Sequence, residues 1–206
     1  MTKFYIIDFA WKRSCIEVLP NIESKDYEKY LLPYKNQRLP EQTTFCIKAF
    51  KKEYDIIGIY QYMSLQLYSK ELISILSSFT DMSDKCYKIS LPDATKEYFV
   101  IYNLPTHICI NLKAFKNWVK NFWPDRPIDR FVINDSIGPV FTLDGFNCVI
   151  VSEEIRKALT KAKITNVEYE EVYGYTPEEA LEWARENPDC ADDFADTDWF
   201  KELLLK

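Results

Sequence analysis

The stretch that most constrains the fold of this chain is residues 140–173, whose pattern predicts strand, turn, strand, helix and strand in succession. Its first part, Val140–Leu143, is β-branched and aromatic, and the Asp144-Gly145 pair that follows is a signal for a two-residue hairpin turn. The returning segment, Phe146–Val151, is apolar almost throughout, as expected of a strand buried on both faces. We therefore expect an antiparallel hairpin near the centre of a sheet.

A serine separates this hairpin from the predicted helix. Ser152 is a strong candidate for the helix N-cap, and apolar residues then recur at the spacing of one helical face, namely Ile155, Ala158, Leu159 and Ala162. Residues Val167–Val172 supply the strand that follows. The same order, a strand, then Ser69, then an amphipathic helix, occurs 83 residues earlier. We expect two such units to flank one mixed sheet.

Length and composition favour a globular protein, and the order of the predicted strands and helices favours the α+β class. The chain has 206 residues, of which 47% are hydrophobic and 28% are charged. We expect a single domain with a mixed, largely antiparallel sheet, a few flanking helices and an acidic helical C-terminal tail. Residues 1–62 are expected to form an N-terminal lobe, 63–173 the core with both strand–serine–helix–strand units, and 174–206 the tail. A capping box at Thr176–Glu179 predicts where the first tail helix begins.

The negative charge of the chain is concentrated in this tail. The formal net charge is −6, but nine acidic residues and one arginine between Thr176 and Asp198 give that segment −8, which leaves about +2 for the remainder. One interpretation is a solubilising surface around two ordinary helices. The other is a ligand for a basic cleft, such as the clefts of toxic nucleases, through electrostatic complementarity.

Residue types that carry catalysis are scarce. His107 is the only histidine and lies two residues before Cys109 on one face of a predicted strand, so a cysteine-dependent hydrolase is one alternative. With four glycines the chain offers no glycine-rich turn for an oxyanion hole or a phosphate. The six cysteines lack CxxC spacing, which favours buried free thiols in a reducing compartment. We expect no catalytic residue, no bound metal and no cofactor.

The sequence also bears on nucleic acid and membranes as partners. The segment Lys113–Arg130 mixes basic and aromatic residues, which makes a nucleic-acid-binding module a second alternative, although the overall acidity disfavours it. The first residues, Met1–Asp8, lack the long apolar core of a signal peptide. No apolar run approaches the ~20 residues that span a bilayer. We therefore expect a cytoplasmic protein that does not insert into a membrane.

A family resemblance rests on Phe146–Leu159, where an apolar strand is followed by a serine with an acid and then an amphipathic helix. With the later strand Val167–Val172 and the apolar strand Tyr98–Asn103, this region resembles the bacterial immunity proteins of polymorphic and contact-dependent toxin systems, a family long described as a domain of unknown function. The resemblance covers residues 63–172. Asn166 stands where such sequences often have glycine before the last strand.

The resemblance implies a non-enzymatic protein that binds and neutralises a cognate bacterial toxin, and it carries no catalytic residues. On this hypothesis we expect the contact surface to combine a loop, Tyr173–Tyr175, with the acidic tail. The residues expected to contact the toxin are Tyr173, Tyr175, Asp189, Asp192, Asp193, Asp196 and Trp199.

Overall fold

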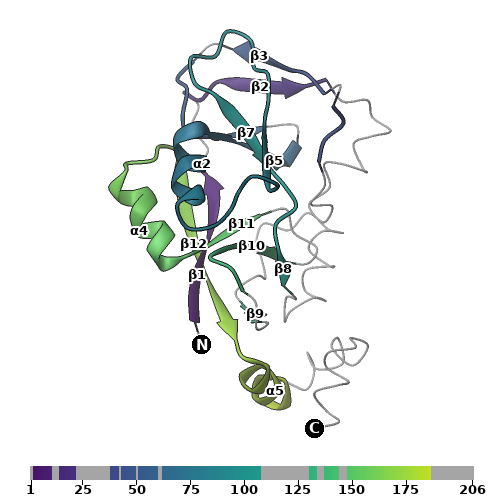
Figure 1. The fold of residues 1–206 in the computed structure, drawn as a ribbon, viewed down its shortest axis with the longest axis vertical. Helices are drawn as coiled ribbons and strands as arrows, with labels where there is room; N and C mark the ends of the chain where they lie inside the picture. The colour runs from purple at the N-terminus through teal and green to yellow at the C-terminus, as the bar shows by residue number, and fades with distance from the viewer. Residues whose placement is uncertain are drawn as a thin grey trace. The chain divides into compact units, whose positions relative to one another are not determined.

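The computed structural model describes residues 2–10, 14–21, 38–41, 43–49, 51–59, 62–107, 130–133, 137–143 and 148–186. Its helices and strands form mixed, mostly antiparallel sheets with flanking helices, which confirms the predicted α+β class (Figure 1). The chain divides into two compact units. Unit 1 contains residues 1–4, 107–137 and 171–206, and unit 2 contains residues 5–106 and 138–170. The division into an N-terminal lobe, a core and a tail follows the sequence alone and stays a prediction.

Three sheets contain all the strands of the described residues. The largest has the hydrogen-bonded order β8 (Thr106–His107), β10 (Val140–Leu143), β11 (Val149–Ser152), β1 (Thr2–Phe9), β12 (Val167–Tyr175) and β9 (Arg130–Val132). An antiparallel sheet has the order β4 (Ile56–Ile59), β5 (Tyr62–Ser69), β7 (Tyr98–Ile101) and β6 (Cys86–Lys88). A third pairs β2 (Glu17–Pro20) with β3 (Phe45–Ala49). The helices are α2 (Lys70–Ser77), α4 (Glu153–Lys161) and α5 (Pro177–Glu186).

In unit 2, two antiparallel hairpins end in a serine and continue directly into a helix. The β4–β5 hairpin leads into α2 through Ser69, and the β10–β11 hairpin leads into α4 through Ser152. The Ser69 amide donates to the Asp55 carbonyl at 2.8 Å, and the Ser152 amide donates to the Pro139 carbonyl at 3.0 Å. Each acceptor immediately precedes the first strand of its hairpin. The two hairpins therefore have the same register relative to their serines.

The two serines differ in how they cap the helix. The Ser69 hydroxyl accepts a hydrogen bond from the Leu72 amide at 3.3 Å. Ser152 has the extended backbone of an N-cap residue, but its side chain makes no capping hydrogen bond. The predicted position of the N-cap is therefore right for α4, whereas the side-chain bond expected from a strong capping residue is absent there.

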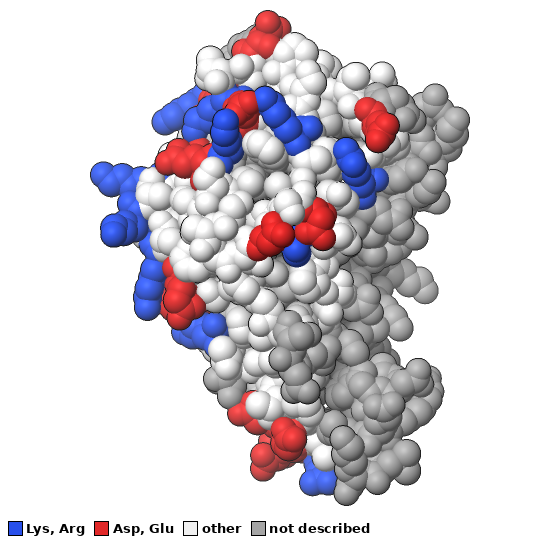
Figure 2. Space-filling view, viewed as in Figure 1, with Lys and Arg blue, Asp and Glu red and all other residues white. Residues whose placement is uncertain are grey.

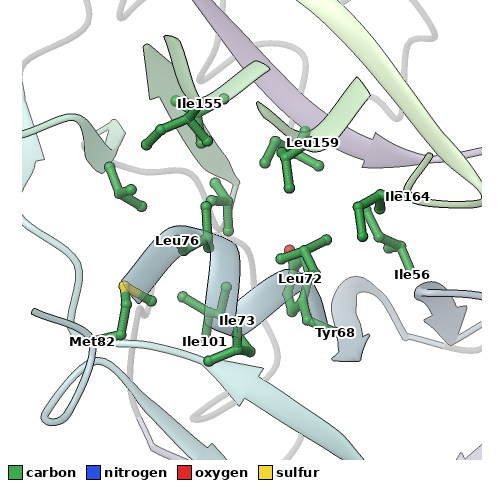
Figure 3. Close-up of a cluster of buried hydrophobic side chains, with 14 of the residues drawn as sticks. Ile56, Tyr68, Leu72, Ile73, Leu76, Met82, Ile101, Ile155, Leu159 and Ile164 are labelled. Atoms are coloured by element: carbon green, nitrogen blue, oxygen red, sulfur yellow. The ribbon is translucent and has the colours of Figure 1, made fainter. Parts of the chain in front are cut away.

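The buried faces of α2 and α4 meet in one hydrophobic core. Leu72 and Leu76 of α2 occupy the third and seventh positions after their serine, and Ile155 and Leu159 of α4 occupy the same positions after theirs. All four side chains are buried in this core, and Figure 3 shows the α2 pair facing the α4 pair. The four-residue spacing that the sequence displays therefore corresponds to helix-on-helix packing.

The four-stranded antiparallel sheet is buried on both faces. Ile56 and Tyr68 lie in the core that contains α2 and α4. The neighbouring residues Ile57 and Leu67 point to the other face and pack in a second core with residues of β2 and β3. Because side chains alternate along a strand, burial on both faces explains why β4 and β5 contain so few charged residues.

Asn166 has a backbone conformation that explains its position before β12. Its φ angle is 63°, in the left-handed region where glycine is most common and asparagine is among the few other residues that enter readily. The Asn166 side-chain nitrogen donates to the Ile56 carbonyl at 2.7 Å, and the Asn166 backbone carbonyl accepts from the Ala10 amide at 3.3 Å. The asparagine thus meets the conformational requirement of a glycine and adds a bond to β4.

Gly58 in β4 allows a close approach that no other residue type permits. A Cβ atom placed there would lie 2.1 Å from ring carbons of the buried Phe9. Gly58→Ala is therefore expected to lower the free energy of unfolding by about 1–3 kcal/mol through overpacking. Gly138→Ala is the matched control, because its nearest neighbour would lie 3.8 Å away. Urea unfolding curves compare the two, and equal midpoints would contradict the packing of Phe9 on Gly58.

Candidate protein-binding surface

Two of the residues expected to contact a partner lie in a strand. Tyr173 and Tyr175 belong to β12, so the prediction that they form a loop is wrong. The strand continues through them because it pairs in parallel with β9, which places Tyr173 opposite Arg130 and Tyr175 opposite Val132. The Ile133 amide also donates to the Tyr175 carbonyl at 2.7 Å. This pairing holds the backbone of both tyrosines in place.

Gly174 lets β9 pack closely against β12 between the two tyrosines. A Cβ atom there would lie 2.6 Å from the Ile133 side chain and 3.1 Å from the Phe131 ring. Phe131 is fully buried and packs against Phe4, with 5.4 Å between ring centroids. Because side chains alternate along a strand, Tyr173 and Tyr175 point to the opposite face from this small core of unit 1.

An ion pair and a hydrogen bond orient Tyr173 on that opposite face. The Tyr173 hydroxyl donates to Glu171 at 3.0 Å, and the Lys3 ammonium lies 3.0 Å from the same carboxylate oxygen. The Lys3 nitrogen is also 5.8 Å from the centroid of the Tyr173 ring, within reach of a cation–π contact. Exposed ion pairs contribute little to stability. The consequence of this one is that it orients an aromatic side chain.

Helix α5 begins two residues after Tyr175 and adds a tryptophan to this region. The Thr176 amide donates to the Glu179 carboxylate at 2.9 Å, and the Glu179 amide donates to the Thr176 hydroxyl at 3.3 Å. These reciprocal bonds confirm the predicted capping box and fix the start of α5. Trp183 of this helix is half-buried, and the central carbon of the Arg130 guanidinium lies over its ring, 5.5 Å from the centroid of the Trp183 ring.

These contacts define the β12–α5 surface of unit 1, which consists of Lys3, Arg130, Glu171, Tyr173, Tyr175 and Trp183. Tyrosine, tryptophan and arginine are the residue types that most often dominate the binding energy of protein interfaces. Side chains that are already held by neighbours lose less conformational entropy on binding than free ones. The chemistry of this surface therefore suits the binding of another protein.

The other expected contact residues, Asp189, Asp192, Asp193, Asp196 and Trp199, lie outside the described residues, as do Cys109 and residues 113–129 of the basic aromatic segment. Sequence reasoning did not identify Lys3, Glu171 or Trp183 as members of a surface. The sequence did indicate a place for Glu171, because residues 171, 173 and 175 are two positions apart and therefore share one face of a strand. Nothing in the pattern related Lys3 or Trp183 to that face.

The histidine that a thiol hydrolase would require is buried in unit 1. His107 is 3% exposed, and its ring centroid lies 6.3 Å from that of Phe131. Burial lowers the pKa of His107 below its ordinary value, which favours the neutral imidazole. Such an environment is typical of a histidine with a structural role. Among the residues that the structure describes, no three histidine, cysteine or acidic side chains are placed to hold a metal ion.

Two cysteines show how far the thiol prediction holds. Cys86 is a half-buried free thiol whose pKa is raised by burial, as expected for an unreactive cysteine. Cys46 is also a free thiol, but it is exposed in β3, so the expectation that it is buried is wrong. In β3 the exposed residues Cys46 and Lys48 alternate with less exposed ones, so Cys46 falls on the exposed side.

In the described part of the chain, no helix has both the length and the apolar character needed to cross a bilayer. No protein-family model matches the chain, and the search of curated proteins likewise found no match.

Proposed function

We propose that this chain is a non-enzymatic, immunity-type protein that binds a cognate bacterial toxin in the cytoplasm and neutralises it stoichiometrically. The observation that carries the proposal is the β12–α5 surface, where the side chains of Tyr173, Trp183 and Arg130 are held by neighbouring groups and Tyr175 is held by the strand pairing of its backbone. Preorganised aromatic and arginine side chains are typical of the energetic centres of protein interfaces.

The scaffold of the surface supports the same proposal. The segment that resembles immunity proteins contains β11, α4 and β12, in the order that its pattern predicts. Strand β12 then continues into Tyr173 and Tyr175. Binding residues on a paired strand and a capped helix are positioned more rigidly than residues on a loop, which favours specific recognition of one partner.

Three buried polar side chains of unit 2 have roles in the fold itself. In unit 2, Asp55 accepts hydrogen bonds from Thr165 and Lys96, Ser69 caps α2, and Asn166 bonds to a β4 carbonyl. Each of these groups joins one part of the backbone to another. Side chains engaged in this way stabilise the fold, and their chemistry does not require a substrate.

The proposal is tested by protection of growing bacteria. The gene beside this one is expected to encode a large secreted protein with a C-terminal toxin module. Co-expression of the chain should restore growth of cells that express the module, and protection should become complete near one molecule of chain per molecule of module. Full protection at a small fraction of that ratio would indicate catalytic turnover, and no protection at any ratio would contradict toxin neutralisation.

Removing the aromatic side chains of the β12–α5 surface should weaken binding. Tyr173→Ala and Trp183→Ala are each expected to lower affinity for the module at least 10-fold, which corresponds to about 1.4 kcal/mol or more, as expected for interface hot spots. Phe79→Ala is the matched control, because Phe79 is a 40% exposed aromatic residue of unit 2 outside this surface. Titration calorimetry measures affinity, and melting curves verify folding. Affinities equal to that of the control would place the contact elsewhere.

A further inference from the structure

Helix α5 carries a row of carboxylates that its own folding does not explain. Glu178, Glu182 and Glu186 are exposed and spaced four residues apart, so they form one ridge along the helix, which we call the α5 ridge. Within the described residues none of the three carboxylates makes an ion pair or a hydrogen bond. Glu179 differs, because it closes the capping box with Thr176.

The α5 ridge costs helix stability. Like charges four residues apart repel one another and destabilise a helix. Glu178 gains from the helix dipole in the first turn, but Glu186 lies in the last turn beside the negative end of that dipole. A helix selected for its own stability would alternate acids with bases at this spacing. The ridge is therefore better explained by an interaction outside the helix.

The α5 ridge lies on the same helix as Trp183, one of the aromatic residues of the β12–α5 surface. Trp183 follows Glu182 in the chain, and Tyr175 is the last residue of β12, two residues before α5 begins. Figure 2 shows acidic side chains over α5 with a basic side chain beside them, and helix α5 contains four glutamates and one arginine, Arg185. An aromatic centre with a charged edge is the usual anatomy of a specific protein interface.

The negative charge of the whole chain is also concentrated in the segment that contains α5. Residues 176–198 carry a formal charge of −8 and the remaining residues about +2. A concentrated charge of one sign accelerates encounters with an oppositely charged partner and slows encounters with a partner of like charge. The partner whose electrostatic potential complements α5 is a protein with a lysine- and arginine-rich surface.

We propose that the β12–α5 surface and the α5 ridge together dock onto a basic surface of the partner protein. In this arrangement Tyr173, Tyr175 and Trp183 form the desolvated centre, and the ridge carboxylates face lysines and arginines at the edge. The inference rests on the proposed function, since it specifies the electrostatic character of the toxin that this chain binds.

The test measures association of the full chain with the purified toxin module of the neighbouring reading frame over a range of salt concentrations. The ridge variant carries Glu178→Gln, Glu182→Gln and Glu186→Gln. The matched control carries Glu41→Gln, Glu71→Gln and Glu168→Gln, which removes the same charge from exposed positions of unit 2. At low salt the ridge variant should associate about 10-fold more slowly than wild type, with a shallower salt dependence, and the control should change less than about 2-fold.

Each alternative outcome has a distinct meaning. If wild type binds the module but the ridge and control variants behave alike, the docking inference is overturned and the proposed function stands. Faster association of the ridge variant would show that the partner surface is acidic, which also overturns the inference. If wild type does not bind the module at all, the proposed function fails and the inference fails with it. Melting curves verify that the ridge and control variants are folded.

Discussion

Leu72→Ala is expected to lower the free energy of unfolding by about 2–5 kcal/mol, among the largest effects of any single truncation in this chain. Leu72 is fully buried, and its side chain extends from α2 toward Leu159 of α4 (Figure 3). Truncation removes apolar contacts and leaves a cavity that two helices on separate hairpins cannot readily fill. Phe79→Ala, at an exposed position just beyond α2, should change stability by less than about 0.5 kcal/mol.

A double-mutant cycle tests whether α2 and α4 stabilise one another. Leu159→Ala alone should cost a similar amount, and the combined variant should deviate from additivity by about 0.5–3 kcal/mol, as neighbouring core residues do. Urea unfolding at neutral pH supplies the three free-energy differences. Strict additivity, with both single variants strongly destabilised, would contradict direct packing of the two helices.

Asp55→Ala should lower the free energy of unfolding by about 3 kcal/mol, because several hydrogen bonds are lost together. The Asp55 side chain is 4% exposed. One carboxylate oxygen accepts from the Lys96 ammonium at 2.6 Å, and the other accepts from the Thr165 amide at 2.8 Å and the Thr165 hydroxyl at 2.6 Å. Asp84→Ala removes an exposed carboxylate that pairs with Lys85 and should have little effect. Equal losses in the two variants would contradict a structural role for Asp55.

The contribution of Asp55 should also depend on pH. Burial raises the pKa of Asp55, but hydrogen bonds from Lys96 and Thr165 outweigh it and hold the pKa below its ordinary value of 3.8. A carboxyl group whose pKa is lowered by folding stabilises the protein above its unfolded pKa and loses that contribution as pH falls through its folded pKa. The stability difference between wild type and Asp55→Asn should be constant from about pH 7 to pH 5 and narrow below about pH 4. Denaturant unfolding across this range measures it, and a difference that widens on acidification would reverse the sign of the argument.

Helices were predictable from this sequence because their signals are local. The apolar spacing after Ser69 and Ser152 and the capping box at Thr176 each lie within about two turns of the residues they organise. The repeated strand–serine–helix order was visible for the same reason. What the pattern did not show is that the two hairpins share a register and that their helices pack on each other.

Features that depend on distant partners were not predictable. Tyr173 and Tyr175 were identified from residue type, but their place in a strand depends on β9, more than 40 residues earlier in the chain. Asp55 and Thr165 are 110 residues apart, and no local pattern relates them. The positions of Lys3 and Trp183 on the β12–α5 surface likewise require strand pairing and a helix direction that only the folded chain supplies.

Titration calorimetry of the full chain with the toxin module of the neighbouring reading frame tests the central claim most directly. If the chain acts by stoichiometric binding through the β12–α5 surface, the titration should saturate at one chain per module, and Trp183→Ala should weaken it while Phe79→Ala does not. A titration without saturable heat, or a module that this chain modifies while remaining unbound, would contradict the account.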